Sequence, residues 1–74
     1  MPRLQRPATR RYEKGEQTRE LILKTARRLF TKQGYHKTSV YDLFRQAEIT
    51  KGAFYHHWKA KEELALTIFR EMER

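Results

Sequence analysis

The sequence contains no cysteine, so neither a disulfide framework nor a cysteine-based zinc site can stabilise the fold. It also contains no run of about 18 apolar residues, the length that a membrane-spanning helix needs. The N-terminus lacks the apolar block of a signal peptide. We therefore predict a cytoplasmic protein that makes no use of a membrane.

Groups that support catalysis are scarce as well. Asp42 is the only aspartate, and no glycine-rich phosphate-binding loop is present. His56 and His57 are adjacent, and neighbouring side chains on a helix point about 100° apart, which disfavours a shared metal ion. We expect His57 to pack at the border of a helix and His56 to face solvent or a phosphate. The sequence thus predicts no enzyme, no cofactor and no metal site.

The positive charge is what stands out, and it is unevenly distributed. The 74 residues carry a net charge of +8. Residues 1–15 hold five basic side chains against one acidic, residues 16–58 hold eight against four, and residues 59–74 hold four of each. This asymmetry favours a polyanionic partner on one side of the domain.

Residues 1–15 contain both prolines and few bulky apolar side chains, which predicts a disordered basic arm. Two interpretations of this arm stay open. It is either a solvated tail, or an arm that follows phosphates or enters a minor groove through Arg3, Arg6, Arg10 or Arg11.

The rest of the chain predicts an all-α domain without strands. A first helix is expected over Glu16–Gln33, and Gly34 can take the positive φ that often ends a helix. Its apolar side chains recur on one face: Ile22, Leu23, Ala26, Leu29 and Phe30. A last helix is expected over Lys61–Arg74, with Leu66 outside its apolar stripe. Leu66 is either a singly exposed leucine or part of a docking surface.

Between these helices, Thr38–Trp58 predicts two short helices joined by a tight turn, Thr38–Ala47 and Thr50–His57. Ser39 or Thr38 can cap the first, with Asp42 as the partner of a capping box, and Thr50 can cap the second. Ile49, Phe54 and Trp58 would face inward. A short helix that is braced in this way and begins with small and basic residues is typical of a helix-turn-helix.

The outward groups of this unit suit double-stranded DNA. Lys51 can reach a guanine edge or a phosphate, Gly52 allows close approach of the backbone, and Ala53 can touch a thymine methyl group. The remaining candidates would meet phosphates beside the groove: Thr38, Tyr41, Tyr55, His56 and Lys61.

Five segments, in this order and spacing, resemble the N-terminal DNA-binding domain of the tetracycline-repressor (TetR) family of bacterial transcriptional regulators: TRELIL-x-x-A-x-x-LF (18–30), GYHKTSV (34–40), DLFRQA (42–47), ITKGAFYHHW (49–58) and KEEL (61–64). The resemblance implies a three-helix, homeodomain-like bundle whose third helix enters the major groove, and a fourth helix whose start adds phosphate contacts. Carried over by position, it implies these DNA-binding residues: Thr38, Tyr41, Thr50, Lys51, Gly52, Ala53, Tyr55, His56 and Lys61.

Three residues depart from the family's pattern. Glu48 stands where the turn usually has Gly, Phe44 replaces a usual Ala, and Ala60 replaces a capping Ser. Glu48 must either take a left-handed conformation, at a cost of about 1–2 kcal/mol, or the turn must be built differently.

The predicted organisation is therefore a basic arm (1–15), a helix-turn-helix domain (16–60) and a fourth helix (61–74). The resemblance implies that this helix would lead into a ligand-binding and dimerisation domain that is absent here, and that the full-length protein is a homodimer. The predicted function is sequence-specific DNA binding by a transcriptional regulator, and we expect it to be a repressor. The alternative is a basic helical module that binds a protein partner or an anionic surface.

Overall fold

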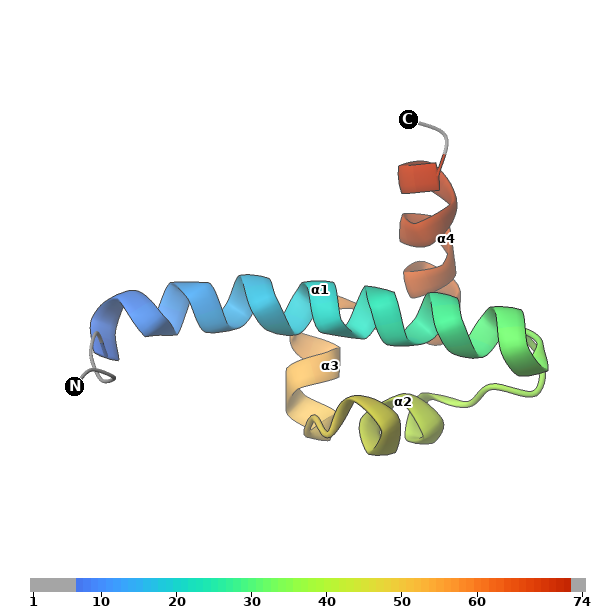
Figure 1. The fold of residues 1–74 in the computed structure, drawn as a ribbon, viewed down its shortest axis with the longest axis horizontal. Helices are drawn as coiled ribbons and strands as arrows, with labels where there is room; N and C mark the ends of the chain where they lie inside the picture. Colours follow the sequence, from blue (N-terminus) through green and yellow to red (C-terminus); the bar gives the residue numbers. More distant parts are fainter. Residues whose placement is uncertain (1–6, 73–74) are drawn as a thin grey trace.

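The computed structural model describes residues 7–72, and the regular structure in that range is entirely helical, which confirms the predicted all-α class. It consists of α1 (Pro7–Gln33), α2 (Val40–Ala47), α3 (Lys51–His57) and α4 (Lys61–Met72). The long α1 crosses the domain, α2 and α3 lie on one side of it, and α4 projects from the other side (Figure 1). None of the helices in the described range is long and apolar enough to cross a membrane.

The start of α1 corrects the sequence-based boundary. The helix begins at Pro7, whereas the sequence predicted a disordered arm up to Gly15 and a helix only from Glu16. Proline suits the first position of a helix, because the N–H that it lacks would have no partner there. Helix-forming Ala and Arg residues follow, and an existing helix extends at little cost. The rest of the predicted arm, residues 1–6, lies outside the described residues, as do residues 73–74 of the predicted last helix.

The four helices share one hydrophobic core. Leu43 of α2 and Phe54 of α3 are fully buried, and Leu64 and Ile68 of α4 close the core from the other side. Four of the α1 residues that the helical period placed on one face are buried together: Ile22, Leu23, Ala26 and Leu29. Phe30, the fifth, packs at the edge of the core. The core thus contacts every helix and holds α2 and α3 against α1.

Two caps fix the ends of α2. The predicted capping box is present, because Asp42 N donates to Ser39 Oγ (3.2 Å) and Ser39 N donates to Asp42 Oδ2 (2.9 Å). At the other end Glu48 takes the left-handed conformation, with φ 56° and ψ 49°. The N–H of Ile49 donates to Phe44 O (3.0 Å) and that of Glu48 to Arg45 O (3.3 Å), the pairing of a Schellman motif. The turn is therefore built with Glu48 in the strained, left-handed conformation, and not in a different geometry that would avoid it.

The start of α4 compensates for its missing capping hydroxyl. Ala60 offers no side-chain acceptor, but the Glu63 carboxylate accepts a hydrogen bond from Lys59 N at 3.0 Å. Further along α4, Leu66, Phe69 and Met72 are exposed, as the width of the apolar stripe predicted for Leu66. Whether this face docks another surface stays a prediction.

Candidate nucleic-acid interface

Helix α3 is locked to the domain by two aromatic side chains. Phe54 is fully buried and Trp58, the residue that ends the helix, is 5% exposed. Their ring centroids lie 5.9 Å apart, and Phe44 of α2 meets Phe54 at 5.8 Å in an edge-to-face contact. The N-cap is Thr50, as predicted, and its Oγ1 accepts a hydrogen bond from Ala53 N at 3.0 Å. The rotation of α3 about its own axis is thereby fixed.

The remaining part of the α3 surface is open to solvent. Lys51, Gly52, Tyr55 and His56 are exposed, while Ala53 is half-buried beside them. These are five of the nine residues that the sequence predicted as DNA-binding, and a single helix brings them together. Thr50 is exposed too, although its hydroxyl already serves as a cap.

Gly52 has no structural reason to be glycine. Its φ is not positive, and an added Cβ would meet only Thr50 Oγ1, at 4.0 Å. A glycine inside a helix costs about 0.5–1 kcal/mol relative to alanine. The fold therefore carries this cost without needing the residue, which suits a backbone that something outside the chain must approach closely.

Aromatic contacts connect the exposed tyrosines of α2 and α3. Tyr41 is 62% exposed and packs edge-on against Phe44, with ring centroids 5.6 Å apart. Phe44 in turn meets Tyr55 at 6.3 Å. The Phe44 side chain, larger than the alanine usual in the family, thus lies between two phenols on the outer surface and supports both.

Thr38 is placed differently from its prediction. Its side chain is fully buried, its hydroxyl donates to Gly34 O at 2.8 Å, and Gln33 Nε2 donates to that hydroxyl at 3.2 Å. A hydroxyl that is enclosed in this way cannot reach a phosphate. Thr38 therefore stabilises the α1–α2 turn, and we leave it out of the interface.

Lys61 is also engaged inside the domain. Its Nζ donates to Tyr35 O at 2.8 Å and to Thr38 O at 2.9 Å, and it lies 4.0 Å from the centroid of the Tyr35 ring. Desolvation raises the pKa of the Tyr35 phenol, and the Glu62 carboxylate adds to this. The predicted phosphate-contacting lysine thus already has partners.

His56 and His57 separate as their spacing predicted. His56 is exposed, and His57 is half-buried between the rings of His56 (4.9 Å) and Trp58 (5.5 Å). Desolvation lowers the pKa of His57, and the positive charges of His56 and Arg19 lower it further. Among the described residues, no three histidine or carboxylate side chains converge on a point that could hold a metal ion.

The sequence missed how close α1 comes to α3. Gly15 and Thr18 line a surface hollow together with Ala53, His56 and His57. The part of α1 around Gly15 and Thr18 therefore lies beside exposed residues of α3. Pro7 marks the start of α1, whereas the composition of residues 1–15 suggested a disordered tail.

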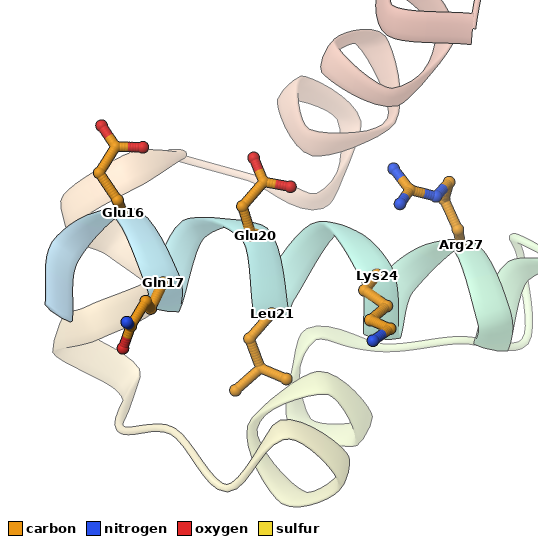
Figure 2. A pocket seen from close by; sticks show the side chains of 6 residues that line it. All are labelled: Glu16, Gln17, Glu20, Leu21, Lys24 and Arg27. Carbon is orange, nitrogen blue, oxygen red and sulfur yellow. The ribbon is translucent and has the colours of Figure 1, made fainter. Parts of the chain in front are cut away.

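Farther along, the outward face of α1 is a solvated surface. Figure 2 shows the residues that line a shallow hollow there: Glu16, Gln17, Glu20, Leu21, Lys24 and Arg27. Leu21, 41% exposed, stands among charged neighbours, acidic toward one end and basic toward the other. These charged side chains of α1 are open to solvent on a shallow surface.

Comparison with known proteins agrees with the helix-turn-helix arrangement of α2 and α3. Residues 22–68 match the sequence profile described as "Bacterial regulatory proteins, tetR family". The chain is 36% identical over 59 residues to the Transposon Tn10 TetC protein of Escherichia coli, covering 80% of this chain and 30% of that protein. It is 38% identical over 61 residues to the HTH-type transcriptional regulator AcrR of Shigella flexneri, covering 82% and 28%.

A third relative is the HTH-type transcriptional regulator QacR of Staphylococcus aureus, 40% identical over 50 residues, which cover 68% of this chain and 27% of QacR. The chain thus spans less than a third of the length of these curated relatives. No solved structure matches it. The profile match covers α2 and α3 completely, together with most of the core that supports them. The chain belongs to the tetR family of bacterial regulatory proteins and contains the family's N-terminal helix-turn-helix domain.

Proposed function

We propose that this chain binds double-stranded DNA, with α3 in the major groove, as the DNA-binding part of a cytoplasmic transcriptional regulator. The observation that carries the proposal is the division of α3 into two faces. Phe54 and Trp58 are buried, whereas Lys51, Gly52 and Tyr55 are exposed. A short helix that is held rigidly and displays small, basic and hydroxyl groups is what major-groove recognition requires.

Each outward group has a task in this arrangement. Lys51 carries a charge to a guanine edge or a phosphate, and Ala53 can meet a thymine methyl group. Tyr41, Tyr55 and His56 provide donors for the phosphates that flank the groove, and Phe44 holds the two phenols in place. Thr50 stays at the edge of this set, because the residue is exposed even though its hydroxyl is used as a cap.

The basic segment before Gly15 extends the interface. Because Gly15 and Thr18 line a hollow together with Ala53 and His56, this part of α1 lies on the side of the domain that is proposed to face DNA. Arginines on this segment would contact the neighbouring backbone or minor groove. The functional interpretation of the arm is favoured over that of an idle tail.

A regulator of this kind acts as a homodimer on two half-sites about one helical turn apart. One domain offers one half-site, so the isolated chain should bind weakly and lose affinity as salt rises. We place dimerisation, and any response to an inducer, in parts of a full-length regulator outside these residues. Repression is the expected outcome, since a protein bound at an operator excludes other proteins from it.

The experiment is a selection of bound duplexes from a random pool, followed by titration of the recovered duplex with the chain and its variants. Lys51→Ala and Tyr55→Phe should weaken binding while the circular dichroism spectrum and melting temperature stay unchanged. Arg70→Ala is the charge-matched control, because α4 projects from the side of α1 opposite to α2 and α3 (Figure 1). This variant should bind as the wild type does.

Other outcomes point elsewhere. If no sequence is enriched and all duplexes bind equally, base recognition by α3 is wrong. If the chain binds anionic lipid vesicles or a protein in preference to every duplex, the positive face serves an interaction module instead. Equal loss of affinity in Arg70→Ala and Lys51→Ala would show that only the total charge matters.

A further inference from the structure

One exposed face of α1 carries acidic side chains at one end and basic side chains at the other. Its charged residues follow one another at intervals of four, and all of them are exposed: Glu16, Glu20, Lys24 and Arg28. Residues at this spacing are neighbours on the surface of a helix, so they form one row, which we call the α1 row. Figure 2 shows its first three members along the shallow hollow on α1, together with Leu21. The row is acidic over its first half and basic over its second.

Contacts within one chain do not account for this order of charges. The first two members are like-charged neighbours, as are the last two, and at this spacing repulsion destabilises a helix. In the described part of the chain Lys24 and Arg28 form no ion pair, while Glu20 pairs with Arg19 at 3.4 Å. The row also lies outside the first and last turns of α1, and the helix dipole acts chiefly within those turns.

A second copy of the α1 row supplies the missing opposite charges. In a twofold-symmetric contact, a residue i that meets residue j is matched by j meeting i. Two antiparallel rows with the twofold axis beside position 22 place Glu20 opposite Lys24. Glu16 then lies opposite Arg28, because this pair is centred on the same position. Leu21, which is 41% exposed and one position from the axis, adds apolar surface near the centre.

We propose that the α1 row binds the α1 row of a second copy of this chain, with the two helices antiparallel. The contact is independent of the proposed DNA binding, since no residue that is proposed to contact DNA belongs to the row. One helix face buries less than the roughly 1,600 Å² of a standard interface, and its ion pairs are exposed, so the contact is weak and sensitive to salt. It acts between copies that are already held close together, where the effective concentration is in the millimolar range.

Exchanging charges within the row tests the register of this contact at constant net charge. Glu16→Lys/Arg28→Glu reverses one proposed pair and keeps its charges opposite. Glu16→Lys/Lys24→Glu has the same net charge but makes every proposed pair repulsive. The substituted residues are exposed, and Lys and Glu are both good helix formers, so each variant should fold, which circular dichroism checks. Self-association is measured by sedimentation equilibrium at low salt, with protein up to about 1 mM.

The wild type should self-associate weakly, and high salt should abolish the association. Glu16→Lys/Arg28→Glu should associate within about twofold of the wild type, and Glu16→Lys/Lys24→Glu at least about tenfold more weakly. Equal association of the two variants would overturn the inference, because the charges would then act without register. A wild type that stays monomeric over the whole concentration range would overturn it too. Neither result touches the proposed DNA binding, which is measured separately with duplex.

Two further variants show whether the partner is the same face of a second copy. Glu16→Lys/Glu20→Lys makes the row wholly basic, and Lys24→Glu/Arg28→Glu makes it wholly acidic. Each alone should self-associate at least about tenfold more weakly than the wild type, whereas an equimolar mixture should form a heterodimer. The acidic variant has a net charge of only 8 − 4 = +4, so overall repulsion alone predicts that it self-associates more strongly. That result, or a mixture without heterodimer, would contradict pairing between α1 rows.

Discussion

The indole Nε1 of Trp58 donates a hydrogen bond to the Thr67 hydroxyl at 2.9 Å and so joins the end of α3 to the middle of α4. The hydroxyl in turn donates to Glu63 O at 3.2 Å within α4. Because Trp58 is 5% exposed, its N–H has little access to water, and Thr67 is its partner in the fold. This contact fixes α4 relative to α3.

Thr67→Val should therefore lower the free energy of unfolding by about 1–2 kcal/mol, since the substitution keeps the shape of the side chain but leaves a nearly buried N–H without an acceptor. Urea unfolding followed by the fluorescence of Trp58, the only tryptophan, measures the change. The emission of the folded variant should shift as well.

The matched control is Thr67→Val in a Trp58→Phe background, where no indole N–H exists to be satisfied. There the cost should shrink to a few tenths of a kcal/mol, with circular dichroism replacing fluorescence as the readout. The same cost in both backgrounds would mean that the hydroxyl acts through Glu63 O alone.

Glu48→Gly should stabilise the domain by about 1 kcal/mol. Glu48 is exposed, and its backbone is held at φ 56° by the Schellman hydrogen bonds of Ile49 and its own N–H. A non-glycine residue in this region bears a penalty of about 1–2 kcal/mol that glycine does not, partly offset by the greater freedom of glycine in the unfolded chain. Thermal unfolding monitored by circular dichroism gives the difference.

Gly34, with φ 96°, provides the reverse experiment at the end of α1. Gly34→Ala has room for its Cβ, so a loss of stability there reports the backbone conformation and not a clash. If Glu48→Gly leaves the melting temperature unchanged while Gly34→Ala lowers it, the Glu48 side chain itself must stabilise the turn.

Local sequence signals predicted the parts of the fold that local chemistry decides. Ser39 with Asp42, Thr50 at the start of α3 and Gly34 at the end of α1 are caps whose partners lie within a few residues. The helical period likewise identified the core face of α1. The exposed set on α3 followed from the same period once Phe54 was assigned to the interior.

Local sequence signals did not predict the partners of Lys61 and Thr38 or the first residue of α1. Lys61 and Thr38 have side chains that suit phosphate contacts, and only the folded chain brings Lys61 to the carbonyls of Tyr35 and Thr38. Burial of Thr38 depends on how the turn closes over Gly34. The predicted start of α1, Glu16, was wrong because the composition of residues 1–15 suggested disorder, although Pro7 suits the first position of a helix.

The stability of the domain should decrease as the pH falls from 7 to 5, with His57 as one source. Its pKa is lower in the folded state, chiefly through desolvation, so the unfolded chain takes up the proton at a higher pH. The contribution is fully present above the unfolded value of about 6.5 and is lost as the pH falls through it toward the folded pKa. His57→Gln should flatten the decrease, measured by urea unfolding at each pH.

The pH range separates this effect from that of a second titrating group. The Asp42 carboxyl has a pKa lowered mainly by its hydrogen bond from the Ser39 backbone, so its contribution is lost only in more acidic solution, below about pH 4. An unchanged decrease in His57→Gln would exclude His57 as its source.

Gly52 allows stability and DNA binding to be changed in opposite directions. Gly52→Ala adds one methyl group on the exposed face of α3, where the fold has room for it, and should raise the free energy of unfolding by about 0.5–1 kcal/mol. If DNA approaches the backbone there, the same methyl group should weaken binding of the selected duplex by at least tenfold.

A Gly52→Ala variant that is more stable and binds DNA as tightly as the wild type would show that the backbone of α3 does not approach the duplex. In that case the groove would be read through the side chains of Lys51 and Tyr55 alone.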